Sequence, residues 1–160
     1  MQLRKVLGTI LAVAAVAVTL VGFGAPAQAS NIGNEGCTPG YWKNHTDNWE
    51  EAQPTDLLAT KYSAVLMSSV AGVTMLEALG LRGGPGVSGA ERILARAATA
   101  AYLNAAHEGV GYPWRRNRPG LDGRPALVPT VNAAYDSDDR ATMLDLATRL
   151  DNDNNLGCPL

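Results

Sequence analysis

Apolar residues recur at helical spacing in several parts of the chain, and no stretch shows the sustained alternation typical of a half-buried strand. The clearest helical pattern lies between Ser88 and Gly109. Ser88-Gly89-Ala90-Glu91 has the form of a capping box, and Gly109 stands where a glycine commonly ends a helix. The apolar stripe consists of Ile93, Leu94, Ala97, Ala98, Ala101 and Ala105. Because its alanines allow neighbours to approach closely, we expect this to be the central helix of the core.

A second strong helix is predicted near the end of the sequence. Met143, Leu146, Ala147 and Leu150 repeat at helical spacing, and we expect Asp138 to cap the first turn. The helix is followed by the polar run 151–155, which resembles the start of a calcium loop but has leucine where such a loop requires glycine. We therefore favour a frayed helix end, in which asparagine side chains cap carbonyl groups, and keep calcium as the alternative.

Weaker patterns predict the remaining elements. Shorter helical segments are expected at 46–51, 62–73, 74–79 and 131–135. Loops are expected at 80–89, which is rich in glycine, and at 109–129, which contains four prolines. Thr38-Pro39-Gly40 is typical of a turn with a positive φ at the glycine. Together these elements predict an all-α fold, a small single-domain helical bundle with long loops.

The first 29 residues are expected to lie outside this domain. Arg4 and Lys5 precede a long apolar run, and Ala27-Gln28-Ala29 provides the small-x-small pattern that signal peptidase requires. We therefore expect a secretory signal at 1–29, rather than an uncleaved anchor, and a mature domain at 30–160. No second long apolar run follows, so we expect no membrane insertion after cleavage and a secreted or extracellular location in the cell envelope.

The two cysteines, Cys37 and Cys158, lie at opposite ends of the expected domain. In an exported protein a pair of cysteines usually forms a disulfide, and closing so long a loop contributes about 4–5 kcal/mol in the chain-entropy model. A zinc site would require His45 and His107 to converge on both cysteines, so the disulfide is favoured. We expect no cofactor.

Charge argues against nucleic acid as a partner. The chain has 13 basic and 15 acidic side chains. Two of the basic ones, Arg4 and Lys5, lie in the expected signal, which leaves 11 against 15 and a net charge of −4. Export and a negative balance both disfavour nucleic acid, so any anionic partner would need a local basic patch.

Three pieces of sequence together resemble a known group of proteins. The pieces are Cys37 with 40–45 (Gly-Tyr-Trp-Lys-Asn-His) and Trp49, 103–107 (Leu-Asn-Ala-Ala-His) with Tyr112-Pro113, and 139–143 leading to 154–160, which ends in Gly-Cys-Pro-Leu. The chain resembles exported bacterial proteins that carry the Gly-Tyr-Trp-Lys-Asn-His motif near the start and the Gly-Cys-Pro-Leu ending. The resemblance covers most of the mature domain, departs at the arginine-rich stretch after Pro113, and implies no particular activity.

Two groups of residues are candidates for binding. The first could stack on sugar faces and bond hydroxyls or phosphates, although for Tyr41 and Trp42 packing beneath the disulfide is the favoured interpretation. It consists of Tyr41, Trp42, Lys43, Asn44, His45 and Trp49. The second, Trp114, Arg115, Arg116 and Arg118, could grip phosphate or carboxylate. Alternatively, this second group could dock on the protein's own acidic segment, 136–153.

A catalytic role is the less favoured interpretation. His45 could act as a base oriented by Asp47 or Glu50, but no nucleophile accompanies it, because Ser88 is better explained as a helix cap. The sequence thus predicts an exported non-catalytic module that binds cell-wall glycan or an anionic envelope polymer. The alternatives are a small secreted hydrolase that uses His45 with a carboxylate and a purely structural envelope protein.

Overall fold

The computed structural model describes residues 32–160, and the expected signal segment 1–29 lies outside the described residues. Within residues 32–160 the structure is helical and contains no strand, which confirms the all-α prediction. The α-helices are α1 (Pro39–Asn44), α2 (Met75–Ala78), α3 (Gly86–Ala106), α4 (Leu127–Asp136) and α5 (Arg140–Asn154). Short 3-10 helices occur at Thr46–Asn48, Leu58–Thr60 and Ser63–Met67. None of the described helices is both long and apolar enough to cross a membrane.

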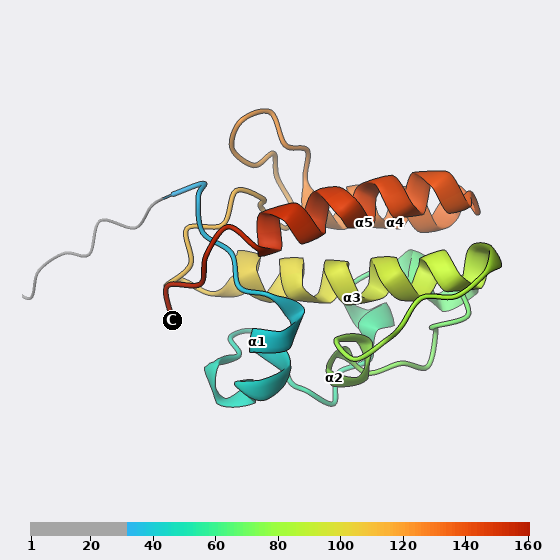
Figure 1. Cartoon of the computed structure of the whole chain (residues 1–160), viewed down its shortest axis with the longest axis horizontal. Helices are drawn as coiled ribbons and strands as arrows, with labels where there is room; N and C mark the ends of the chain where they lie inside the picture. Colours follow the sequence, from blue (N-terminus) through green and yellow to red (C-terminus); the bar gives the residue numbers. More distant parts are fainter. Residues whose placement is uncertain (1–31) are drawn as a thin grey trace, which may run out of the picture.

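Helix α3 runs through the middle of the domain, with α5 and α4 on one side and α1 and α2 on the other (Figure 1). Helices α3 and α5 lie side by side and point the same way. At their starts Arg140 donates to the carbonyl oxygens of Gly84 and Gly86. Asn154, at the end of α5, donates to the carbonyl oxygen of Ala97 in the middle of α3 and accepts from Asn104 near its end. The alanines of α3 are buried on nearly every side, so the predicted central helix is confirmed.

The ends of α3 differ from those expected. The helix begins at Gly86 and Ser88 does not cap it; Glu91, the other half of the expected capping box, accepts hydrogen bonds from Ser69 instead. It ends at Ala106, so Gly109 lies beyond the C-cap and donates its N–H to the His107 ring. At the start of α3, Ser69, which is distant in sequence, takes the Glu91 carboxylate that a capping box would have used. At its end, the His107 ring takes the Gly109 N–H that a C-terminal cap would have used.

The start of α1 was predicted as a turn and is the first turn of a helix. Thr38 is the N-cap, accepting from the Tyr41 N–H at 3.1 Å, and Pro39 follows at the first helical position, where its missing N–H costs nothing. The positive φ expected at Gly40 is not observed. The segment expected to be helical at 46–51 forms only the 3-10 helix Thr46–Asn48.

The remaining segments also depart from the expected bounds. At 62–73 the chain forms only a 3-10 helix, because the Ser68 hydroxyl bonds the Val65 carbonyl and the Val70 N–H, offering the backbone an alternative to a helix. The Thr74–Glu77 capping box is confirmed. Helix α4 is longer than the expected 131–135, and α5 is capped by Asp139 rather than by Asp138.

The two ends of the described chain are joined. Cys37 and Cys158 form the predicted disulfide, and beside it the Gly36 N–H donates to the Gly157 carbonyl at 2.9 Å. Gly36 passes so close to α5 that a Cβ atom there would lie 2.1 Å from the Asp153 carbonyl oxygen. Cys37 is fully buried, whereas Cys158 is exposed. The disulfide therefore joins a buried segment near the start of the described chain to an exposed segment at its end.

Candidate functional site

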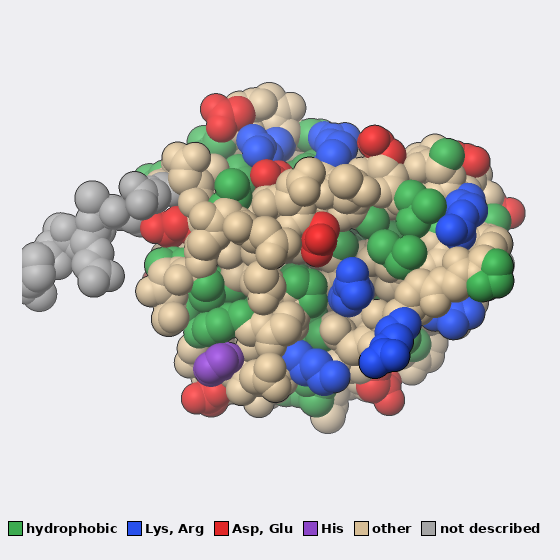
Figure 2. Space-filling view, in the orientation of Figure 1, with side chains coloured by type: hydrophobic (Ala, Val, Ile, Leu, Met, Phe, Trp, Pro, Cys, Tyr) green, Lys and Arg blue, Asp and Glu red, His purple; other side chains and the backbone are tan. Residues whose placement is uncertain are grey.

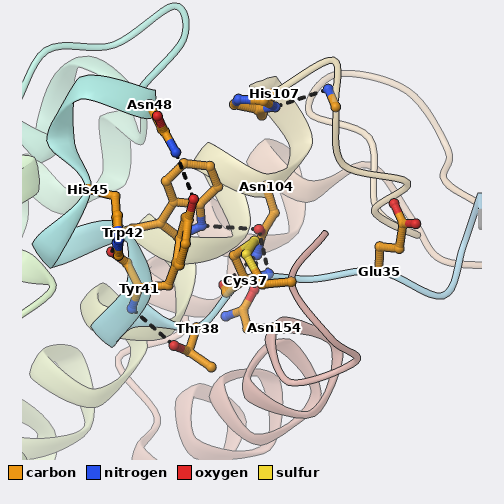
Figure 3. Close-up of a disulfide and its surroundings, with 12 residues drawn as sticks. Glu35, Cys37, Thr38, Tyr41, Trp42, His45, Asn48, Asn104, His107 and Asn154 are labelled. Carbon is orange, nitrogen blue, oxygen red and sulfur yellow. Dashed lines mark hydrogen bonds between the residues drawn. A yellow bond between two sulfur atoms is a disulfide. The ribbon is translucent and has the colours of Figure 1, made fainter. Parts of the chain in front are cut away.

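The residues of the Gly-Tyr-Trp-Lys-Asn-His motif divide between the interior and the surface. Trp42 is 0% exposed, and its indole N–H donates to the Asn104 side chain at 3.0 Å (Figure 3). Tyr41 and Trp49 are half-buried, and the Trp49 indole donates to the Trp42 carbonyl. Trp42 therefore packs beside the disulfide and is not part of a surface platform. The exposed members of the motif are Lys43, Asn44 and His45.

Asn104, on α3, is the centre of a buried polar network. Its Oδ1 accepts from the Cys37 backbone N–H at 2.8 Å and from the Trp42 indole, and its Nδ2 donates to the Cys37 carbonyl and to Asn154 Oδ1, both at 2.9 Å. The side chain is 0% exposed, and all four of its hydrogen-bonding positions are occupied. Asn104 thus makes the hydrogen bonds to the Cys37 backbone that water would make if this segment were exposed.

Asn154, at the end of α5, extends this network. Its Oδ1 also accepts from the Tyr112 hydroxyl at 2.8 Å, and its Nδ2 donates to the Ala97 carbonyl at 3.0 Å. Burial, assisted by the negative charge of Asp153, raises the pKa of Tyr112 well above its usual range, so the phenol stays a hydrogen-bond donor.

This network joins the three pieces of sequence that carry the family resemblance. The first piece contributes Cys37 and Trp42, the second Asn104 and Tyr112, and the third Asn154. The described geometry thus explains the three pieces as one structural unit around the disulfide. Neither Asn104 nor Asn154 could be recognised as its centre from the sequence, because a lone asparagine in a helix gives no local signal.

His45 lies on the surface side of the motif, stacked on Tyr41 with ring centroids 4.3 Å apart. Its Nδ1 is 2.9 Å from the Tyr41 carbonyl oxygen. Because a carbonyl can only accept, Nδ1 carries the proton and Nε2 is left as the acceptor. The Glu50 carboxylate, expected to orient His45, lies instead 3.5 Å from His107 Nε2 and accepts from the Glu108 N–H at 2.9 Å.

His107 is a polar feature that the sequence analysis did not single out for function. Its Nδ1 accepts from the Gly109 N–H at 3.0 Å, which places the ring proton on Nε2, facing Glu50. The ring centroid is 5.8 Å from that of Trp42. His107 thus packs against Trp42, and its pairing with Glu50 links the segment after α1 to the end of α3.

The arginine-rich loop is docked on α5 by one of its arginines. Trp114 is 0% exposed and its indole donates to Asp153 at 2.6 Å, so it lies inside the protein. Arg124 forms two hydrogen bonds with the same carboxylate, both at 2.9 Å, and Arg149 lies over the Trp114 ring. The interpretation in which the loop docks on the protein's own acidic segment therefore holds for Trp114 and Arg124.

The other arginines of the loop face a hollow of about 350 Å³, which we call the arginine hollow. It is lined by Ala105, Arg115, Arg116, Asn117 and Arg118. The Arg115 side chain donates to the Tyr112 and Trp114 carbonyls. Arg116 pairs with Glu51 at 2.5 Å, a hydrogen bond that lowers the pKa of this carboxyl. Arg118 is exposed and has no partner within residues 32–160. Three arginines thus line one hollow, and Glu51 is the carboxylate that pairs with one of them.

The polar run 151–155, expected to follow the helix, forms the last residues of α5 and its C-cap. Asp153 and Asn154 are buried and bonded as described above, and the Asn155 amide donates to the Asp151 carbonyl at 2.6 Å, which is the capping role expected for an asparagine here. Across residues 32–160 no group of three or more His, Cys, Asp or Glu side chains is placed to hold a metal ion.

Lysine and arginine side chains also gather around the motif. Figure 2 shows them over α2 and the loop between α2 and α3. Lys43 reaches this area, because its Nζ lies 3.2 Å from where a Cβ atom on Gly80 would be. The chain therefore presents two positively charged surfaces, one beside the motif and one at the arginine hollow.

Comparisons of the chain with protein-family models, with curated proteins and with solved structures find no match.

Proposed function

We propose that the domain is a non-catalytic module of the cell envelope that binds an anionic polymer at the arginine hollow. The observation that carries the proposal is the placement of Arg115, Arg116 and Arg118 around one hollow in a chain whose expected mature net charge is negative. Guanidinium groups form paired hydrogen bonds with phosphate and carboxylate oxygens, so their convergence favours an anion.

The backbone of the arginine segment is fixed before any ligand arrives. The carbonyl oxygens of Arg115 and Arg116 accept from the Leu127 and Val128 N–H groups at 2.8 and 2.9 Å, and Trp114 is anchored on Asp153. A site whose backbone is already ordered loses less entropy when it binds, which favours affinity from few contacts.

The neighbouring hollow beside Trp114 is a poorer candidate for an anion. It has about 320 Å³ and is lined by Asp122 and Asp153 as well as by Arg124 and Arg149. Its arginine nearest the acids, Arg124, is already paired with Asp153. The charges there cancel, whereas those of the arginine hollow do not.

The test is binding of the oxidised domain, residues 30–160, to three polymers: a phosphate polymer (wall teichoic acid), a carboxylate polymer (polygalacturonate) and a neutral glycan (dextran). Isothermal titration at two salt concentrations would give the affinity and its salt dependence. We expect the two anionic polymers to bind and higher salt to weaken them. Equal binding of dextran, or no binding of any polymer, would overturn the proposal; the second result would favour a purely structural role.

The variant Arg116→Gln/Arg118→Gln places the site. We expect it to weaken binding by about tenfold or more, since each charged hydrogen bond contributes roughly 1.5–3 kcal/mol at most. The matched control is Arg82→Gln/Arg92→Gln, which removes the same charge elsewhere on the surface. A third variant, Lys43→Ala/His45→Ala, tests the motif surface. If the control or the motif variant lost as much affinity as Arg116→Gln/Arg118→Gln, the arginine hollow would not be the site.

A further inference from the structure

A third hollow, whose charge is opposite to that of the arginine hollow, lies between α4 and the start of α3. It has about 260 Å³, and its lining includes Ala64, Met67, Glu91, Tyr135, Asp136 and Asp138. These residues come from the 3-10 helix Ser63–Met67, from α3, from α4 and from the turn that follows α4. Three of them are acidic and none of the described residues that line it is basic. We call it the acidic hollow.

Glu91 is the member of this lining that calls for an explanation. Glu91 is only 8% exposed. One of its carboxylate oxygens, Oε2, accepts from both the N–H and the hydroxyl of Ser69. Within residues 32–160 the other oxygen, Oε1, has no hydrogen-bond partner, and no lysine, arginine or histidine pairs with the carboxylate. The carboxylate therefore keeps one oxygen without a partner among the residues that line the hollow, and this oxygen can accept from a cationic donor.

The basic side chains nearest in sequence are engaged elsewhere. Arg92 donates to the Ser88 carbonyl, and Arg140 donates to the carbonyls of Gly84 and Gly86. The Tyr135 hydroxyl, beneath the hollow, donates to the Glu91 carbonyl at 3.0 Å. Burial, and next the charge of Glu91, raise the pKa of Tyr135, so this phenol adds no negative charge of its own.

One part of the lining of the acidic hollow, formed by Ala64 and Met67, is apolar, which narrows the chemistry of the ligand. Met67 is 92% exposed and its neighbour Leu66 is 62% exposed, although large apolar side chains are usually covered. A bare metal ion would gain nothing from such a lining. A cationic head on an aliphatic stem would place its charge against Glu91 and its stem against Met67.

We propose that the acidic hollow binds an alkylammonium or alkylguanidinium group, held by Glu91 and the exposed carboxylates of Asp136 and Asp138. The volume is below the 300–1,000 Å³ typical of pockets for drug-sized molecules and suits a group as small as one side chain. Two sources share this chemistry: a free amine, and the lysine or arginine side chain of a peptide. The site is separate from the arginine hollow, so neither proposal depends on the other.

The test is titration of the oxidised domain, followed by two-dimensional NMR of the backbone amides, with n-butylammonium as the probe and n-butanol as its neutral counterpart at equal ionic strength. We expect saturable shifts at Ala64, Ser69 and Glu91 with butylammonium, and none with n-butanol. Shifts that are absent, that do not saturate, or that appear equally with n-butanol would overturn the proposal.

Variants assign the effect to the carboxylates. Glu91→Gln keeps an oxygen that can accept from Ser69 but removes the charge, and we expect it to weaken butylammonium binding by about tenfold. Asp136→Asn/Asp138→Asn changes exposed groups only and should weaken binding several-fold in a domain whose fold is unaltered. Asp145→Asn, exposed on α5, is the matched control and should change nothing. Unchanged affinity in both Glu91→Gln and Asp136→Asn/Asp138→Asn would overturn the proposal.

A further pair of probes separates the two sources. Putrescine represents a free amine, and Nα-acetyl-lysine methylamide represents a lysine within a peptide. Binding of the lysine derivative at least as tight as that of butylammonium would identify a peptide side chain, because the mouth of the hollow would then admit a backbone. Binding of putrescine and butylammonium alone would identify a free amine. Failure of all three cationic probes would overturn the proposal.

Discussion

Replacing Asn104 by alanine would remove the centre of the network beside the disulfide. The substitution deletes four hydrogen bonds and leaves three buried groups without a partner: the Cys37 N–H and carbonyl and the Trp42 indole N–H. Asn154 Oδ1 keeps only the hydrogen bond from the Tyr112 hydroxyl. A buried hydrogen bond contributes about 1 kcal/mol net, and an abandoned buried group can cost more. We therefore expect the free energy of unfolding to fall by about 4 kcal/mol, a large share of the 5–15 kcal/mol typical of a domain.

Urea unfolding of the oxidised domain, followed by tryptophan fluorescence, would measure this loss, because Trp42 and Trp114 are fully buried in the folded state. The control is Asn152→Ala, at an exposed position of α5. This variant should lie within about 0.5 kcal/mol of the unaltered domain. A loss below about 1 kcal/mol for Asn104→Ala would refute the view that this network stabilises the fold.

Asn104→Asp tests the same reasoning through pH. One carboxylate oxygen would keep the two bonds that Asn104 Oδ1 accepts, but the other would face two acceptors, the Cys37 carbonyl and Asn154 Oδ1. Burial beside acceptors raises the folded-state pKa of a carboxyl above its unfolded value of about 3.9. The variant should therefore be most stable at low pH and lose stability as the pH rises through the raised pKa. Stability that does not fall with rising pH would contradict this.

Three further predictions concern the disulfide, the docked loop and the buried phenols. Cys37→Ser/Cys158→Ser should lower the free energy of unfolding by about 4–5 kcal/mol, measured against the oxidised domain in urea, and an unchanged value would be inconsistent with the long closed loop. Arg124→Ala leaves the mostly buried Asp153 carboxylate without its cation and should lower the free energy of unfolding by about 3 kcal/mol. Arg118→Ala, on the exposed part of the loop, should leave this free energy almost unchanged. Equal losses in the two variants would contradict the prediction. Burial raises the pKa of three phenols, so the folded state holds these protons more tightly than the unfolded state does. The free energy of unfolding should therefore be at its full value below about pH 10 and fall as the pH rises above it. A free energy of unfolding that does not change from about pH 9 to 11 would contradict the raised pKa values. The phenols are those of Tyr62, Tyr112 and Tyr135.

The elements that sequence predicted well are those that carry their own pattern. The apolar stripe of α3 and the repeat from Met143 to Leu150 in α5 follow the helical period, and the pairing of Cys37 with Cys158 follows from their number and the expected export. Helix boundaries were less predictable, because a distant residue can take a capping group. Glu91 has the right spacing to complete a capping box with Ser88, but Ser69 takes its carboxylate.

The candidate site was harder to predict, because it depends on which side chains point inward. A tryptophan suits a sugar platform and a core equally well, and the sequence contains nothing that distinguishes Trp42, which packs in the core, from an exposed ring. The same holds for the loop, where Arg124 is the anchor and Arg118 is free within the described residues, although both read as basic loop residues. The pairing of Glu50 with His107 rather than with the nearby His45 is likewise set by tertiary structure.

The closure of the domain end to end has a consequence for its biosynthesis. Cys37 and Trp42 leave the ribosome early, but their partners Asn104, Asn154 and Cys158 are made much later. Helix α1 packs against α3, so it has no packing partner until the middle of the domain has been translated, and the disulfide of its segment forms only after Cys158 is made. A nonsense codon before Asn154 would remove no dispensable tail; it would leave Cys37 without its disulfide partner and Asn104 without the Asn154 side chain.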